Sequence, residues 1–145
     1  MTAARLRIGV AGAGYFGRFH ALKVAASPRA VLSGITDPDP ARAAALAQEA
    51  GAPALGWQAL LAASDAIVVA APAEAHFELA DAALAAGRHV LVEKPIAATL
   101  DQADRLAARA AAAGRVLQVG HLLRYTAEYQ AITARMRRPV YIECV

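Results

Sequence analysis

The chain has 145 residues, of which 58% are hydrophobic and 19% charged, and its net charge is +3. This length suits about one domain with a buried core, and the composition excludes a disordered chain. The basic cluster of Arg135, Arg137 and Arg138 is better explained by a solvated helix face than by nucleic-acid binding. No apolar run is as long as a membrane span, and the chain does not open with a signal-peptide pattern. We therefore expect neither a nucleic acid nor a membrane as a partner.

Cysteine and histidine usage indicates a reducing compartment and no metal centre. Cys144 is the single cysteine and cannot form an internal disulfide, which suits the cytoplasm. The four histidines, His20, His76, His89 and His121, lack metal-ligand spacing. We predict a cytoplasmic protein without a metal site.

Short apolar runs alternate with helical patterns along the whole chain. The expected strands are Leu6–Val10, Val31–Thr36, a weak one at Pro53–Leu55, Ala66–Ala70, Val90–Glu93 and Val116–Val119. The expected helices are Tyr15–Ala26, one from Pro40 to near Gly51, Gln58–Ala62, Ala75–Ala86 and Leu100–Ala113. This alternation predicts an α/β fold with a doubly wound parallel sheet, a Rossmann dinucleotide-binding fold.

Several residues fit the ends of these helices. Asp39 followed by Pro40 is a good N-cap and first-position pair. Thr99 with Gln102 has the spacing of a capping box. Gly87 and Gly114 each follow a helical pattern and would end it.

The unusual residues of the chain stand at the carboxyl ends of the expected strands. In a doubly wound sheet ligands bind at that edge, where the strand order reverses. With the usual order 3-2-1-4-5-6, the first and fourth strands border the crevice. The segments that follow the strands are 12–17, Asp37, Ala71-Pro72, Glu93-Lys94-Pro95 and Gly120-His121.

The segment 12–17, GAGYFG, joins the first strand to the first helix. Gly12 would make the tight turn, Gly14 would let a pyrophosphate approach the backbone, and Gly17 would let the helix pack closely on the strand. The free N–H groups of the new helix would meet the phosphates. We assign these three glycines, with Tyr15 and Phe16, to a cofactor site.

Asp37 lies twenty residues beyond Gly17, where a carboxylate can accept hydrogen bonds from the adenosine ribose. It would repel a 2′-phosphate, so NAD is favoured over NADP, although Arg18 and Arg42 could soften this preference. The alternative is that Asp37 only opens the Asp-Pro-Asp-Pro turn.

Together these motifs resemble the N-terminal half of the Gfo/Idh/MocA family of NAD(P)-dependent oxidoreductases, which includes glucose–fructose oxidoreductase and inositol dehydrogenase. The matching stretches are GAGYFGRFH (12–20), AAPAEAH (70–76), AGRHVLVEKPIA (86–97) and VGHLLRY (119–125). The Glu-Lys-Pro element is the most specific of them. The resemblance implies hydride transfer between a nicotinamide cofactor and a secondary alcohol or ketone of a sugar, cyclitol or sugar nucleotide.

The resemblance also assigns individual residues. It makes Lys94 the catalytic lysine and proton shuttle and also a cofactor-binding residue beside the nicotinamide, and it places Glu93 at the nicotinamide ribose. It places Ala71, Pro72 and His76 along the cofactor. It turns His121 and Arg124 towards the substrate. For His76, a place in the first turn of a helix without cofactor contact is an equal alternative, and His20 is interpreted as structural.

Family members continue into a second α/β domain that holds the substrate and makes most oligomer contacts. We therefore divide the chain into a dinucleotide-binding domain at 1–121 and, at 122–145, a connecting helix and the first strand of a substrate domain. The final stretch PVYIECV (139–145) would be that strand. The resemblance implies a homo-oligomeric enzyme, of which this chain alone is inactive. The alternative is a stand-alone dinucleotide-binding module that senses redox state or serves a partner subunit.

Overall fold

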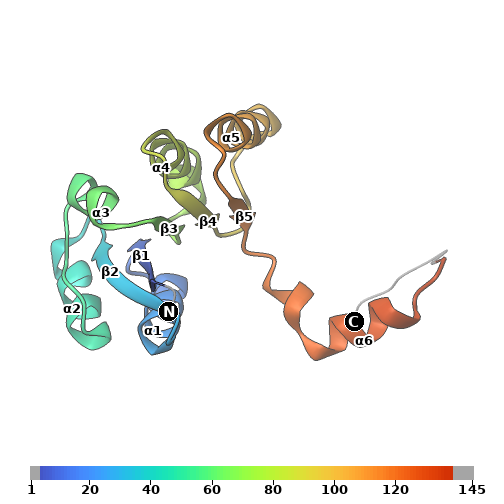
Figure 1. The fold of residues 1–145 in the computed structure, drawn as a ribbon, viewed down its shortest axis with the longest axis horizontal. Coiled ribbons are helices and arrows are strands. Elements are labelled where there is room, and N and C mark those ends of the chain that lie inside the picture. The colour runs from blue at the N-terminus through green and yellow to red at the C-terminus, as the bar shows by residue number, and fades with distance from the viewer. Residues whose placement is uncertain (1–3, 139–145) are drawn as a thin grey trace.

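A five-stranded parallel sheet with helices on both faces forms the body of the molecule in the computed structural model, which describes residues 4–138 (Figure 1). The strands are β1 (Leu6–Ala11), β2 (Ala30–Thr36), β3 (Ala66–Val69), β4 (His89–Val92) and β5 (Leu117–Val119). The helices are α1 (Tyr15–Ala26), α2 (Pro40–Ala50), α3 (Trp57–Ala63), α4 (Ala73–Ala85), α5 (Leu100–Ala113) and α6 (Ala127–Arg135), with a 3₁₀ turn η1 (Leu122–Tyr125). The predicted doubly wound fold is confirmed.

The sheet has five strands in the order β2-β1-β3-β4-β5. The prediction of six strands was therefore wrong, because the segment 53–55 does not form a strand of the sheet. The segment 53–55 makes only an isolated bridge between Ala54 and Ile35. Ile35 N–H donates to Pro53 O at 3.0 Å, and Leu55 N–H donates to Ile35 O at 2.8 Å. Pro53 has no N–H of its own, and the turn before it and Gly56 after it leave no length for a ladder.

The two faces of the sheet carry separate apolar clusters. Along β3, Ile67 and Val69 face the cluster that holds α3, α4 and α5, whereas Val68 faces the cluster that holds α1 and α2. Successive side chains of a strand point to opposite faces, so a strand covered on both sides has no polar position. This explains the unbroken AIVV sequence of β3.

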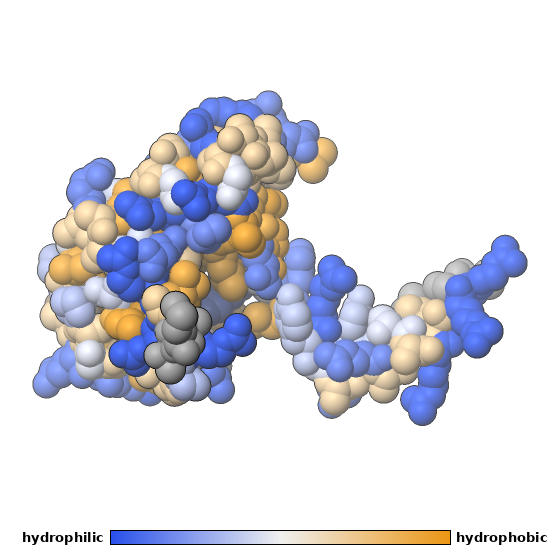
Figure 2. Space-filling view, viewed as in Figure 1, coloured by the Kyte–Doolittle hydropathy of each residue, from blue (hydrophilic) through white to orange (hydrophobic). Residues whose placement is uncertain are grey.

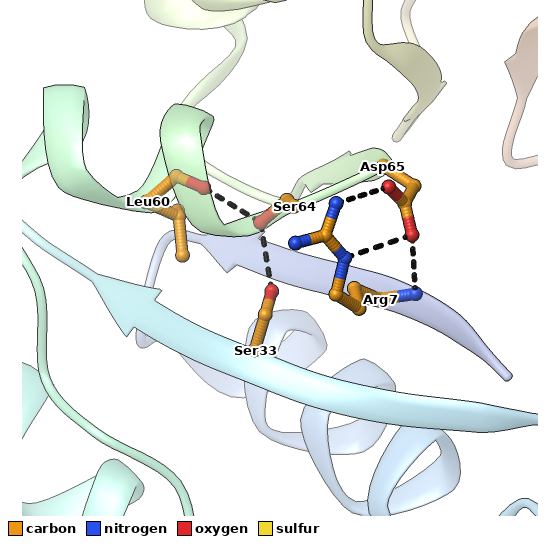
Figure 3. Close-up of polar contacts among 5 residues, drawn as sticks. All are labelled: Arg7, Ser33, Leu60, Ser64 and Asp65. Carbon is orange, nitrogen blue, oxygen red and sulfur yellow. Dashed lines mark hydrogen bonds and ion pairs between the residues drawn. The ribbon is translucent and has the colours of Figure 1, made fainter.

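A polar network ties the amino-terminal half of the sheet together (Figure 3). The Arg7 guanidinium holds the Asp65 carboxylate at 2.5 and 3.1 Å, and the Arg7 N–H donates to it at 3.0 Å. These bonds lower the pKa of Asp65 to about 2. The contact joins the start of β1 to the residue before β3.

Beside this pair, the buried Ser64 hydroxyl donates to Leu60 O at 2.6 Å (Figure 3). Since a hydroxyl has one hydrogen, Ser64 accepts from Ser33, whose Oγ lies 2.7 Å away. A methyl group on Gly9 would lie 2.6 Å from Ser64 Oγ, so only glycine lets α3 approach β1 this closely. The hydroxyl chain thus connects α3 to β2 across β1.

The residues expected to end the helices do so, except that one hydrogen bond of the capping box has a different donor. Thr99 Oγ1 accepts from Gln102 N–H at 3.3 Å, but Gln102 Oε1 accepts from Ala98 N–H rather than from Thr99. Gly114 is the left-handed C-cap of α5. Gly87, with φ of 74°, comes one residue after the C-cap of α4.

Beyond β5, η1 and α6 form a C-terminal arm, residues 122–135, that stands apart from the sheet (Figure 1). In the space-filling view the arm mixes hydrophilic and apolar residues (Figure 2). Leu123, Tyr125 and Ile132 are exposed on it. Within residues 4–138, no helix is both long and apolar enough to cross a bilayer. The strand expected at 139–145 lies outside the described residues.

Candidate dinucleotide site

A cleft of about 560 Å³ opens at the carboxyl edge of the sheet, between the ends of β1 and β3. Its walls come from the loop after β1, the end of β2 and the segment from the end of β3 into α4. Seven residues assigned from the sequence to the cofactor line it: Gly12, Gly14, Tyr15, Phe16, Asp37, Ala71 and Pro72. Segments distant in sequence therefore meet at the edge that the strand order predicts.

The three glycines of the loop have different surroundings. Gly12 has φ of 103°, and a methyl group there would lie 2.5 Å from Ala70 O. A methyl group on Gly17 would overlap Gly12 O. Gly14, in contrast, has ordinary extended backbone and no atom within 4 Å of its missing Cβ. Gly12 and Gly17 are thus required for the turn and the packing of α1, and Gly14 leaves open space in the cleft.

The N-terminus of α1 has no side-chain cap. The first-turn N–H groups of a helix have no partner within the helix. Here they follow Gly14, beside which the space is open, and they carry the partial positive charge of the helix dipole. A phosphate oxygen is the acceptor that this arrangement suits, so the loop fits the pyrophosphate of a dinucleotide.

Asp37 follows β2, and its carboxylate is only 6% exposed. Oδ2 accepts from Ala13 N–H at 2.8 Å, and Oδ1 accepts from Asp39 N–H at 2.9 Å. Arg42 Nη2 lies 3.2 Å from Oδ1. Because each carboxylate oxygen accepts about two hydrogen bonds, Oδ2 keeps one free acceptor position for a ribose hydroxyl. Asp37 therefore anchors the glycine-rich loop as well as lining the cleft.

The cleft includes residues that the sequence reasoning did not assign. Ala75, Glu78 and Leu79 line it from α4, and Trp57 lines it from α3. The first three follow Pro72 at helical spacing of three, six and seven residues, so the periodicity of α4 could have identified them. Trp57 gave no such signal.

Glu93 and Lys94 follow β4 and point to different surroundings. The Glu93 carboxylate is buried, with Oε1 2.7 Å from His20 Nε2. The Lys94 side chain is exposed, and its Nζ lies 6.0 Å from the centre of the Phe16 ring. Since Phe16 lines the cleft, Lys94 is placed at the rim of the cleft beside the start of α1.

His76 is 1% exposed and does not line the cleft. Its ring lies between two backbone carbonyls, with Nδ1 2.7 Å from Pro95 O and Nε2 2.9 Å from Ala71 O. It therefore joins the segment after β3 to the segment after β4. His121 and Arg124 belong to the stretch that leads into the C-terminal arm, are exposed, and are not among the lining residues.

Among residues 4–138 there is no group of three or more His, Cys, Asp or Glu side chains that could hold a metal ion. The open glycine loop, the uncapped helix and an acidic residue after β2 define a dinucleotide-binding Rossmann domain. Comparison with known families agrees. The model of the GFO_IDH_MocA family, described as "Oxidoreductase family, NAD-binding Rossmann fold", matches residues 6–121, and the chain belongs to this family.

The curated relatives of the chain include dehydrogenases named for a sugar nucleotide and for a cyclitol. The UDP-N-acetylglucosamine 3-dehydrogenase of Acidithiobacillus ferrooxidans is 39% identical over 140 residues, which cover 95% of this chain and 44% of the relative. An inositol 2-dehydrogenase of Saccharopolyspora erythraea is 35% identical, covering 97% of this chain and 45% of the relative. The chain thus spans less than half the length of these relatives.

Solved structures give the same result. The Acidithiobacillus ferrooxidans UDP-N-acetylglucosamine 3-dehydrogenase GnnA superposes with a TM-score of 0.86 at 38% identity, over 91% of this chain and 44% of that one. GenD2, from gentamicin A biosynthesis, was solved with NAD and superposes with a TM-score of 0.85 at 35% identity, over 90% of this chain and 38% of that one. KijD10, a 3-ketoreductase of Actinomadura kijaniata, was solved with NADP and superposes with a TM-score of 0.83 at 31% identity, over 90% of this chain and 42% of that one. Similar proteins therefore bind either dinucleotide.

Proposed function

We propose that this chain is the cofactor-binding part of a dehydrogenase that acts on a secondary alcohol or ketone of a sugar, cyclitol or sugar nucleotide. The observation that carries the proposal is the open glycine loop in the cleft, together with the Lys94 amine over the ring of Phe16, a residue of the cleft wall. The named activities of the relatives supply the substrate class.

The preferred cofactor in this proposal is NAD. Asp37 lines the cleft and keeps one acceptor position, which suits a ribose hydroxyl. A 2′-phosphate there would meet the carboxylate charge, and Arg42, already paired with Asp37 and Asp39, offsets that repulsion only in part.

Lys94 is the proton-transferring residue in this proposal. A bound nicotinamide dinucleotide supplies the site that accepts or returns the hydride. The chain must then hold the hydroxyl proton, and Lys94 Nζ is the basic group at the rim of the cleft. The positive charge of an oxidised nicotinamide ring beside this amine would favour the neutral form of the amine, which can take the proton. Glu93, which is buried and does not line the cleft, is assigned to the nicotinamide ribose by family resemblance.

The substrate side is assigned to residues beyond the cleft. His121 and Arg124 would face the substrate, and 122–145 would begin the substrate domain, which would also make the contacts of a homo-oligomer. The exposed apolar side chains of the C-terminal arm are consistent with such a neighbour.

The proposal is tested by titrating the chain with NAD and NADP in a calorimeter. We expect both to bind, with NAD tighter. Gly14→Ala should weaken both by about tenfold or more, because its methyl group occupies the space of the pyrophosphate. Gly56→Ala is the matched control, since Gly56 is also an extended N-cap glycine with open space around it. Equal binding by wild type and Gly14→Ala would contradict the assigned site.

A further inference from the structure

The Glu93 carboxylate is fixed by contacts from three elements. It follows β4 and is 5% exposed. His20 of α1 approaches Oε1 at 2.7 Å, and the N–H of Lys94 approaches Oε2 at 3.4 Å. Gly120, after β5, packs so closely that a methyl group there would lie 2.9 Å from the carboxylate atoms. The carboxylate is therefore held in one place.

His20 supplies the strong contact in this arrangement. An ionised carboxylate only accepts hydrogen bonds, so His20 Nε2 carries the hydrogen and donates to Oε1. The His20 side chain is 16% exposed, and the bond is thus shielded from competing water. His20 lies in the first turns of the helix that starts at the glycine loop.

Lys94, next to Glu93 in sequence, has a different environment. Its amine extends over the Phe16 ring. Among the residues that the structure describes, no carboxylate oxygen comes within 4.0 Å of Lys94 Nζ. The amine thus stands next to a buried carboxylate in sequence without pairing with it.

We propose that His20 is a positioning residue that retains the Glu93 carboxylate and so leaves the Lys94 amine without an anionic partner. The inference rests on the proposed role of Lys94 in proton transfer. An ionised carboxylate beside an amine favours the ammonium form, which cannot accept a proton. Without His20, Glu93 would lose its strong donor and could turn to the amine of the adjacent Lys94. The bond from α1 thereby keeps Lys94 reactive.

The chain offers an internal reference for this inference, because Lys23 and Lys94 are its two lysines and both are exposed. Acetic anhydride acetylates only neutral amines. Competitive labelling at one mildly alkaline pH, read by mass spectrometry, gives the reactivity of Lys94 relative to Lys23. The ionisable groups in the contact chain are His20, Glu93 and Lys94 itself.

In His20→Phe, which keeps the ring but loses the donor, we expect the Lys94/Lys23 ratio to fall by about three- to tenfold. In His20→Gln, whose amide can donate to Glu93, the ratio should stay within about twofold of wild type. Gly120→Ala should lower it as well, because the three atoms nearest to the added methyl group belong to the Glu93 carboxylate, which must then move. In the Glu93→Gln background, His20→Phe should have no effect.

A purely structural role for His20 predicts that Phe and Gln variants change alike, and that result would overturn the proposal. An unchanged ratio in folded His20→Phe would do the same. If His20→Phe does not fold, as judged by circular dichroism, Gly120→Ala decides the question. Failure of wild type to bind dinucleotide in the calorimeter would instead remove the proposed function, while the labelling ratios would still report whether His20 retains Glu93.

Discussion

Asp37 and Glu93 are two nearly buried carboxylates that do the same thing at opposite sides of β1. Each follows a strand, β2 for Asp37 and β4 for Glu93, and each holds the segment that leads out of β1. Asp37 accepts from the backbone of Ala13, whereas Glu93 accepts from the side chain of His20. Asp37 lines the cleft and Glu93 does not.

The two carboxylates differ in their hydrogen-bond donors, and this difference suits Asp37 to cofactor binding and Glu93 to the proposed proton transfer. The bonds of Asp37 come mainly from backbone N–H groups, which cannot change protonation, so they suit a permanent support for the phosphate-binding loop. The bond of Glu93 comes from an imidazole beside the proposed reactive lysine. A change on the Asp37 side should therefore alter affinity, and a change on the Glu93 side should alter turnover.

The largest expected effect is a loss of turnover when Lys94, next to Glu93, is replaced. In a polypeptide that joins this chain to a substrate domain, Lys94→Ala should lower kcat by about 10²–10⁴ because the proposed proton acceptor is lost. NAD affinity should hardly change, since the glycine loop and Asp37, which are assigned to the phosphates and the ribose, stay intact. Steady-state kinetics and calorimetry measure the two quantities. Near-normal turnover would reduce Lys94 to a structural or substrate-anchoring residue.

The next effect is on the Asp37 side. Asp37→Ala leaves the N–H groups of Ala13 and Asp39 without their acceptor, at a cost of about 1–3 kcal/mol for each group that water does not reach. We expect NAD affinity to fall by about 10- to 100-fold. Asp37→Asn keeps one acceptor oxygen and should lose less. Both variants should reduce the difference in affinity between NAD and NADP, because the repulsive charge is gone. A larger difference in affinity, measured by calorimetry, would contradict the assignment of Asp37.

A third carboxylate, Asp65, sharpens the comparison because it is partly exposed and far from the cleft, and it should give the smallest effect. Arg7 lowers the pKa of Asp65 from 3.8 to about 2, so their contact stabilises the fold above pH 4 and is lost between about pH 4 and pH 2. Arg7→Met should lower the melting temperature by about 1–4 °C at neutral pH. This difference should shrink as the pH falls from 4 to 2 and vanish below pH 2. A difference independent of pH would show that the ion pair does not stabilise the fold.

The sequence was sufficient for features set by neighbouring residues. The runs of β1 and β3 predicted buried parallel strands, and the GAGYFG spacing placed the loop at the cleft. It was insufficient where partners are distant. His20 and Glu93 are 73 residues apart, and only the strand order brings α1 against the end of β4. The expected strand at 53–55 was wrong for a local reason, since Pro53 donates no N–H and the segment has no length for a ladder.

Helix α1 connects the two halves of the sheet through two hydrogen-bonded contacts, one at the loop that leads into it and one at His20. Its entry at Ala13 is fastened to the end of β2, and its second turn, at His20, is fastened to the end of β4. His20 lies five positions beyond Tyr15, a rise of about 7.5 Å along the axis. Over so short a span a hydrogen-bonded helix is stiff. The helix therefore keeps the attachment at the glycine-rich loop and the attachment at the Glu93 carboxylate at a fixed separation.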